Sequence, residues 1–234
     1  MLQKKVFTRA VSFAAAAMAA AVALSLMFAV APAHASSDPK ISVLKKGTLK
    51  VSYAPGNSDA DSIGFWSDGR SKVSKLKSSK SAVAKAKLKY LKDRNTYIAE
   101  IKLKKAGTAK ITCKVGSKKY AAKIKVYKYE TPIASLKVGK QDLTDSLMPE
   151  NLLRGLGASY AITATGTKAQ KVKVVPADGW KISKIYTEKY SYKGGKEKKT
   201  VKKYKNGAKI KGGFYIDMKN KKTGLVETFC VNRF

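Results

Sequence analysis

Apolar and polar residues alternate with a period of two along much of this chain. Residues 108–115 place Ala, Ile, Cys and Val on one side and Thr and Lys on the other, and residues 120–126 repeat the pattern after a Gly-Ser-Lys-Lys turn. Side chains of a β-strand point alternately to its two faces, so the pattern predicts a hairpin with one buried face and one lysine-rich face. A helical bundle would need apolar residues at a period near 3.6 instead.

Further short runs of the same kind are separated by turns rich in Pro, Gly, Asn and Asp. They predict strands at residues 47–53, 63–66, 72–77, 82–91, 96–103, 133–138, 160–165, 170–175, 180–186, 214–218 and 225–231. One exception is residues 143–157, where Pro149 and Glu150 suit the first turn of a short helix. The spacing of the strands predicts an all-β chain of two tandem immunoglobulin-like β-sandwich domains, at residues 36–129 and 130–234.

The first 35 residues have the parts of a secretory signal peptide. These are the basic residues Lys4, Lys5 and Arg9, the apolar run 11–30, the helix breaker Pro32, and Ala33 and Ala35 around His34. Cleavage is expected after Ala35, which predicts a secreted, extracellular chain that can stay associated with a cell wall and has no membrane span once cleaved. The alternative is an uncleaved anchor, because about 20 apolar residues can cross a bilayer.

Removal of this segment also removes His34, the only histidine of the chain. A mature chain without histidine has no Ser-His-Asp or Cys-His catalysis and no imidazole-bound zinc. The acids are scattered and form no pair that would suit a glycosidase. The sequence therefore predicts a protein that is not an enzyme and holds no cofactor. Cys113 and Cys230 can form one disulfide or remain two separate buried thiols, and both alternatives stay open.

Two stretches of the first half carry a family resemblance. Residues 106–112 (AGTAKIT) followed by residues 122–126 (AKIKV), and residues 63–67 (IGFWS), resemble the closing strands and the central Trp strand of bacterial Ig-like domains of group 2. The resemblance covers residues 41–127, while the second half is only generically Ig-like. It implies a secreted or cell-surface module used in adhesion or as a spacer, as in invasin- and intimin-like proteins, with no catalytic residues to carry over.

The charge of the chain is strongly positive, with 49 Lys+Arg against 15 Asp+Glu and a formal net charge of +34. Only three of the basic residues lie before residue 36, and 42 of the other 46 are lysines, so the mature chain carries +31. Sequence-specific reading of bases favours the planar guanidinium of arginine, whereas lysine is a hydrated point charge. The composition therefore predicts diffuse attraction to anionic cell-wall polymers or acidic glycans, with no sequence-specific nucleic acid partner. A merely solvated lysine surface and a protein partner remain alternatives.

One stretch, residues 193–213, is denser in lysine than the rest and is predicted to form a long basic hairpin, since glycine pairs mark turns along it. Tyrosines among the lysines could stack on sugars or bases while the ammonium groups bind phosphate or sulfate. The alternative function is therefore a secreted effector that binds a polyanion, either an acidic glycan or a nucleic acid. Its candidate residues are Lys193, Lys196, Lys198, Lys199, Lys202, Lys203, Tyr204, Lys205, Lys209 and Lys211.

A weak calcium candidate precedes the strand at residues 63–66. Its oxygen-bearing residues, at positions 1, 3, 5 and 12 of an EF-hand-like spacing, are Asn57, Asp59, Asp61 and Asp68. Ser62 stands where that loop needs glycine, and the last acid is an aspartate instead of the usual glutamate. An ordinary Asx-rich loop is the favoured interpretation, so no metal site is predicted.

Overall fold

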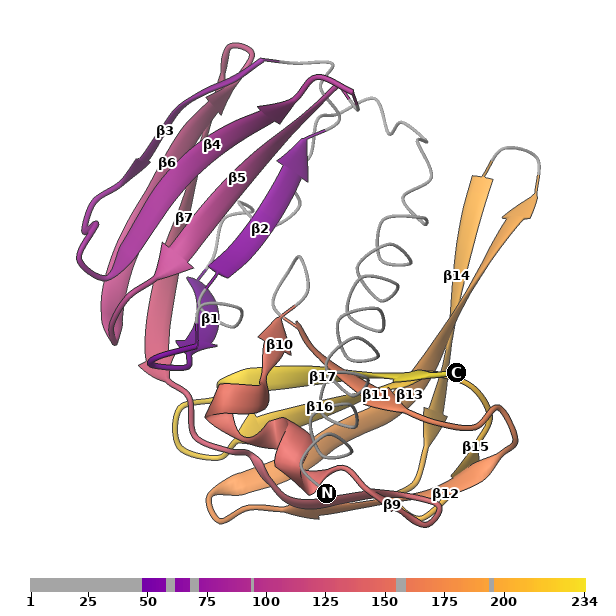
Figure 1. The fold of residues 1–234 in the computed structure, drawn as a ribbon. Helices are drawn as coiled ribbons and strands as arrows, with labels where there is room; N and C mark the ends of the chain where they lie inside the picture. The colour runs from indigo at the N-terminus through magenta and orange to yellow at the C-terminus, as the bar shows by residue number, and fades with distance from the viewer. Residues whose placement is uncertain (1–47, 58–61, 68–71, 94, 155–158, 194–195) are drawn as a thin grey trace, which may run out of the picture. The chain divides into compact units, whose positions relative to one another are not determined.

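The computed structural model describes residues 48–57, 62–67, 72–93, 95–154, 159–193 and 196–234. These residues form strands and two short turns of 3-10 helix (Figure 1). The predicted signal peptide lies outside the described residues, as do Asp59, Asp61 and Asp68 of the weak calcium candidate. Within the described part of the chain, no helix has the length and apolar character needed to cross a membrane.

The first sandwich contains seven strands in two sheets, ordered β1-β7-β6-β3 and β2-β5-β4. They are β1 (Thr48–Tyr53), β2 (Ser62–Ser67), β3 (Val73–Ser78), β4 (Ala84–Leu91), β5 (Thr96–Leu103), β6 (Gly107–Val115) and β7 (Lys118–Lys128). Strand β1 pairs with β7 in parallel, and all other pairs are antiparallel. The sheet of β2, β5 and β4 thus packs against the sheet that contains β3, β6 and β7. An immunoglobulin-like sandwich divides its strands between two sheets in the same way.

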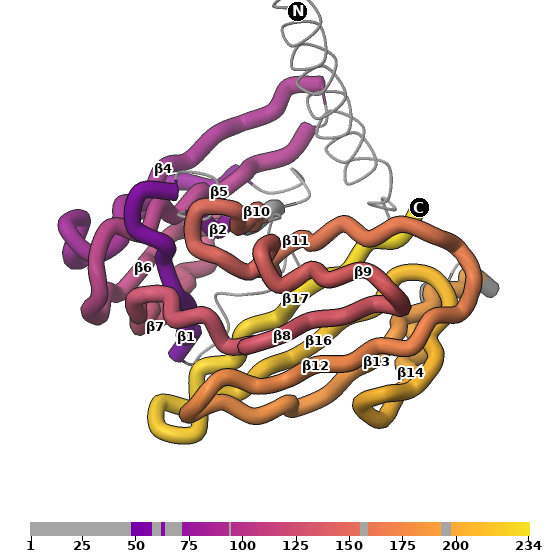
Figure 2. The backbone as a smooth tube through the Cα atoms, turned by 60° about the horizontal axis from the view of Figure 1, so that its bottom comes forward, coloured from indigo at the N-terminus to yellow at the C-terminus, as the bar shows by residue number. Residues whose placement is uncertain are grey.

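The second sandwich has sheets ordered β15-β12-β8-β9 and β10-β11-β17-β16-β13-β14. Its strands are β8 (Ile133–Val138), β9 (Gln141–Asp142), β10 (Leu153–Arg154), β11 (Ser159–Ala164), β12 (Gln170–Pro176), β13 (Trp180–Lys193), β14 (Lys196–Tyr204), β15 (Lys209–Ile210), β16 (Phe214–Asn220) and β17 (Val226–Arg233). Figure 2 shows β8 and β12 side by side, in agreement with their antiparallel pairing. Strand β11 pairs with β17 in parallel, and β14 adds an edge strand beside β13, as in variable-type immunoglobulin domains.

Each sandwich buries one face of its sheets and exposes lysines on the other. In β7 every second side chain is buried, and Lys123 and Lys125 between them are exposed. In β12, Lys171 and Lys173 are exposed in the same alternation. The buried side chains form two hydrophobic clusters, one holding Cys113 and the other Trp180. The predicted all-β fold of two tandem immunoglobulin-like sandwiches is therefore confirmed.

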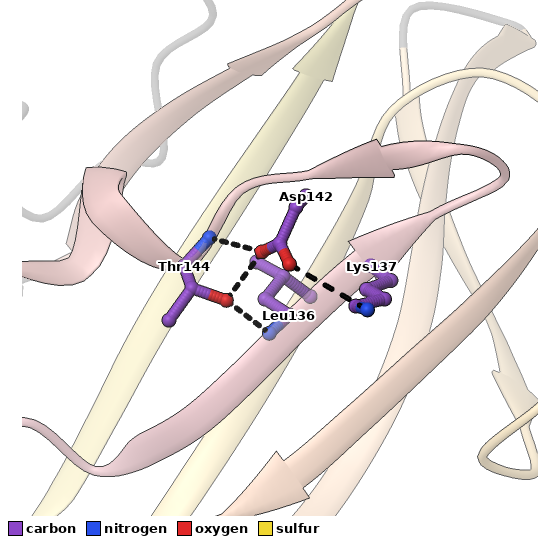
Figure 3. A network of polar contacts seen from close by, with 4 residues as sticks. All are labelled: Leu136, Lys137, Asp142 and Thr144. Atoms are coloured by element: carbon purple, nitrogen blue, oxygen red, sulfur yellow. Dashed lines mark hydrogen bonds and ion pairs between the residues drawn. The ribbon is translucent and has the colours of Figure 1, made fainter.

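The short helix predicted within residues 143–157 is present only as 3-10 turns, the second of which begins at Pro149 as expected, and residues 155–157 lie outside the described residues. Two turns of 3-10 helix, η1 (Thr144–Leu147) and η2 (Pro149–Asn151), take its place and lead into β10. The reason is a network of polar contacts with β8 (Figure 3): Thr144 Oγ1 accepts a hydrogen bond from the backbone N–H of Leu136 at 3.1 Å and donates one to Asp142 at 2.5 Å. The hydrogen bonds from Thr144 hold the pKa of Asp142 below its usual value. These bonds fix the segment against a strand, so its backbone does not wind into an α-helix.

A buried carboxylate, that of Glu227 in β17, lies in a polar cluster with side chains of β1, β10 and β11. The hydroxyl groups of Ser52 and Tyr160 are 2.6 Å apart, and Arg154 Nη2 donates to the Ser52 carbonyl at 2.8 Å and to the Tyr160 hydroxyl. Among the described residues, Glu227 Oε1 has no hydrogen-bond partner. Burial raises the pKa of Glu227 to about 7, although the Ser52 hydrogen bond and the Arg154 charge act in the opposite direction.

Glu227 is expected to make the stability of the protein depend on pH. Its pKa rises from 4.5 in an ordinary environment to about 7 in the folded chain, so the folded state holds the proton more tightly than the unfolded state. The free energy of unfolding should therefore fall by about 3 kcal/mol as the pH rises from 4.5 through 7, and change little above that. Urea unfolding at pH 5 and pH 8 measures this difference.

The matched variant is Glu227→Gln, which keeps the shape of the side chain but cannot ionise. Because the single histidine lies in the predicted signal peptide, few other side chains of the mature chain change their charge in this pH range. The variant should lose most of the slope between pH 5 and pH 8. An equal slope in both proteins would show that Glu227 is not the titrating group.

Candidate functional site

The lysine-rich region is built on the hairpin of β13 and β14. These strands pair continuously from Ile185 opposite Tyr204 to Lys193 opposite Lys196, while β16 pairs with β13 only as far as Tyr186. We call the part beyond Tyr186 the ribbon, which comprises residues 187–193 and 196–202. In the described part of the chain, no third strand pairs with the ribbon, and Figure 1 shows it extending past the rest of its sheet. Its threonines, tyrosines and valine favour an extended backbone.

The structure does not bring all the predicted polyanion-binding residues together. The hairpin ends at Tyr204, and not near residue 213 as predicted, because Lys209 joins β15 in the opposite sheet and Lys211 follows it. Lys205 lies after the end of β14. Along the ribbon, alternation divides the other lysines between two faces. Lys199 and Lys203 lie on the same face of the hairpin as Tyr186. Lys198 and Lys202 lie on the opposite face, as do the register positions of Lys193 and Lys196.

Tyr204 is a structural residue and not an exposed stacking platform. Its side chain is partly buried and packs against the hydrophobic cluster of the second sandwich. It stands opposite Ile185, which is 1% exposed, at the point where the ribbon joins the sheet. The ammonium group of Lys202 lies 5.3 Å from the centre of its ring and covers its outer side. The prediction of a basic hairpin over the whole of residues 193–213 placed Tyr204 in its middle, whereas Tyr204 lies where the hairpin joins the sheet.

A second set of tyrosines, which the sequence analysis only partly identified, lies on the other face. The rings of Tyr186 and Tyr215 stack with their centres 5.1 Å apart, and the ammonium group of Lys184 is 4.1 Å from the centre of the Tyr186 ring. Burial raises the pKa of Tyr186 to about 12. Further along the ribbon, Tyr190 is half exposed and donates a hydrogen bond of 2.8 Å to Glu188. We call this face of β13, β14 and β16 the tyrosine face.

Two lysines of the tyrosine face are paired with acids. Lys199 Nζ lies 2.6 Å from Glu188, and the hydrogen bond with this carboxylate raises the pKa of Lys199. Lys184 Nζ lies 3.2 Å from Asp217, whose side chain is almost fully buried. The acids offset these two positive charges, while Lys203 on the same face is exposed and has no acidic partner among the described residues.

The opposite face of the ribbon differs in both composition and charge. Lys189, Lys198 and Lys202 are exposed there, and no acidic side chain pairs with them among the described residues. The positions directly across from these three lysines are all occupied by hydroxyl residues. We call this surface the lysine face; its members are Thr187, Lys189, Ser191, Lys198, Thr200 and Lys202.

The other candidate sites of the sequence have structural roles where the structure describes them. Asn57 donates hydrogen bonds from its amide to the carbonyls of Pro149 and Leu152, at 2.7 and 2.9 Å. No group of three or more His, Cys, Asp or Glu side chains that could hold a metal ion gathers within the described residues. Cys113 and Cys230 are both free thiols, and burial raises the pKa of each.

Comparisons of sequence identify no relative: no family model matches the chain, and no curated protein matches it. Among solved structures, the chain is similar to domains 4–9 of the surface layer protein SbsC, at 14% identity and a TM-score of 0.29, over 81% of this chain and 30% of that one. Domains 5–6 of the same protein align at 15% identity and a TM-score of 0.28, over 80% and 93% of the two chains. The Yersinia pseudotuberculosis adhesin InvE aligns at 11% identity and a TM-score of 0.24, over 79% and 56%.

The chain thus spans less than a third of the SbsC fragment of domains 4–9. Similarities at this level do not assign a function. The strand orders given above define the class: an all-β chain of two immunoglobulin-like sandwiches.

The structural assignment of Tyr204 predicts unequal effects for two tyrosine substitutions in the same hairpin. Tyr204→Ala removes a ring packed against the core and should lower the free energy of unfolding by about 2 kcal/mol or more. Tyr190→Ala removes a half-exposed ring and should cost less than about 1 kcal/mol. Urea unfolding of both variants measures the difference, and equal losses would contradict the assignment.

Proposed function

We propose that this chain is a secreted, non-catalytic Ig-like protein of a bacterial surface, used in adhesion or as a spacer, that lysines hold to anionic polymers. The observation that carries the proposal is the alternation in both sandwiches, which buries the apolar side chains and leaves lysines outside. Export rests on the signal peptide predicted from the sequence. The resemblance of residues 41–127 to Ig-like domains of group 2 supports a surface module.

The lysines act together, because they are many and spread over both sandwiches. Exposed lysines such as Lys85, Lys102 and Lys123 lie in the first sandwich, and Lys171 and Lys173 lie in the second. At physiological ionic strength a charge is felt over roughly 8 Å, so neighbouring lysines reinforce one another at an anionic surface. Attraction of this kind depends on salt and selects no particular sequence or sugar. Cell-wall polymers and acidic glycans are the expected anionic partners.

A salt titration tests this function. The exported protein is bound to cell-wall fragments and to beads coated with dextran sulfate, then eluted with sodium chloride. Retention on both materials should be lost by about 0.5 M salt, where charges are strongly screened. Two triple Lys→Gln variants, one at Lys85, Lys102 and Lys123 and the other at Lys171, Lys173 and Lys181, should both elute at lower salt than the wild type. Retention that resists salt would contradict the proposal.

A second function, selective binding of one polyanion, is favoured by a single specific observation. The lysine face of the ribbon carries Lys189, Lys198 and Lys202 without acidic partners among the described residues, whereas Lys184 and Lys199 on the tyrosine face are paired with acids.

A further inference from the structure

We propose that the lysine face of the ribbon is a binding site for an acidic polysaccharide, a linear chain with repeated sulfate or phosphate groups that lies along the ribbon. This inference rests on the proposed function and names the site and the ligand class within it. The tyrosine face and the lysines at residues 203–211 lie outside the site.

The register of β13 and β14 arranges the site as a ladder of cross-strand pairs. Three pairs on this face join one lysine to one hydroxyl residue, namely Thr187 with Lys202, Lys189 with Thr200, and Ser191 with Lys198, and the register ends with Lys193 opposite Lys196. The lysine changes strand from each pair to the next. Successive pairs lie two residues apart along the strands, or about 6.7 Å, and the two strands lie about 4.8 Å apart. The lysine positions therefore follow the ribbon in a zigzag, each with a hydroxyl residue across from it, and the ammonium group of Lys202 lies 5.3 Å from the centre of the Tyr204 ring.

The charge of this face is unbalanced before any ligand binds. Neighbouring lysine positions in the zigzag are about 8 Å apart at the backbone, which is close to one screening length at physiological ionic strength, so their charges repel one another. No acid among the described side chains relieves this repulsion, in contrast to the Lys199–Glu188 pair at 2.6 Å on the other face. A bound linear polyanion would relieve it at every pair of the ladder, while the hydroxyl groups of Thr187 and Thr200 donate hydrogen bonds to the anionic oxygens. The Ser191 hydroxyl already donates to the Lys198 carbonyl at 3.4 Å.

The described side chains of the lysine face favour a glycan over the other polyanions. Binding of single-stranded nucleic acid depends on exposed aromatic rings for base stacking, and this face offers only lysine, threonine and serine. A surface that inserts into an anionic membrane has apolar side chains next to its lysines. The exposed apolar residues of the ribbon, Tyr190, Tyr192 and Val201, alternate onto the opposite face. What remains is recognition of charged oxygens along a narrow chain.

The test compares two variants that lose the same charge. Lys189, Lys198 and Lys202 are changed to Gln in the first, and the exposed Lys203, Lys205 and Lys209 in the second, which serves as the control. Affinity for a heparin octasaccharide is measured by calorimetry at several salt concentrations, with unfolding curves to confirm that both variants fold. The first variant should bind at least about 10-fold more weakly and lose about two to three units of the salt slope. The control should lose less than about 3-fold.

A third variant separates close contact from general attraction. Thr187→Val combined with Thr200→Val changes no charge, so the salt slope should stay the same while affinity falls about 3- to 10-fold through lost hydrogen bonds. A dT oligonucleotide of equal charge and phosphatidylglycerol vesicles are the comparison ligands. Both should bind more weakly than the octasaccharide.

Several outcomes overturn the proposal. Equal losses in the two triple variants would mean that binding is diffuse; the proposed surface function would then stand and the ribbon site would fall. Preference for the oligonucleotide would make the ligand a nucleic acid, and vesicle binding abolished by Tyr190→Ser would make it a membrane. Failure of the wild-type protein to bind any of these polyanions at physiological salt would overturn the proposed function as well.

Discussion

Both sandwiches depend on a parallel pair between an early strand and the last strand. Thr48–Tyr53 pairs with β7 in the first sandwich, and Ser159–Ala164 pairs with β17 in the second. These partners are far apart in sequence, so their pairing must overcome the entropy of closing a long loop before the cores can form. Once made, the pair fixes one side of the sheet. In the second sandwich β13 and β14 form the other side of the sheet, and among the described residues no third strand pairs with the ribbon.

The ribbon is unusual because burial does not explain its composition. In the sheets, lysines face solvent simply because the other side of each strand faces a core. Both faces of the ribbon are solvent-exposed beyond Glu188, yet one carries tyrosine, valine and paired charges and the other carries lysine and hydroxyl groups. An edge strand rich in lysine also resists pairing with another sheet, so β14 has a protective role whatever its ligand. The two roles are compatible, since protection uses the edge and binding uses the face.

Period-two alternation made the strands predictable, because a sheet with one buried face leaves that pattern directly in the sequence. It did not distinguish the 3-10 turns after Asp142 from an α-helix, because their form depends on hydrogen bonds between Thr144 and the residues Leu136 of β8 and Asp142 of β9. It also did not separate the lysines of residues 193–213, since their division depends on where the hairpin ends. The burial of Glu227, by contrast, can be predicted from the sequence. In β17, Glu227 and Arg233 fall in the same alternating phase as Phe229 and Val231, which is the buried phase.

The pairing of Lys193 with Lys196 has a consequence for how such a surface can change. Side chains alternate strictly along both strands, so one residue inserted into or deleted from β14 would exchange its two faces without altering its composition. Lys198 and Lys202 would then turn to the side of Tyr190, and Lys199 and Val201 would take their place. The chemistry of the ribbon is therefore encoded in the length of the hairpin as much as in its residues, and a change of length is a short route from one ligand preference to another.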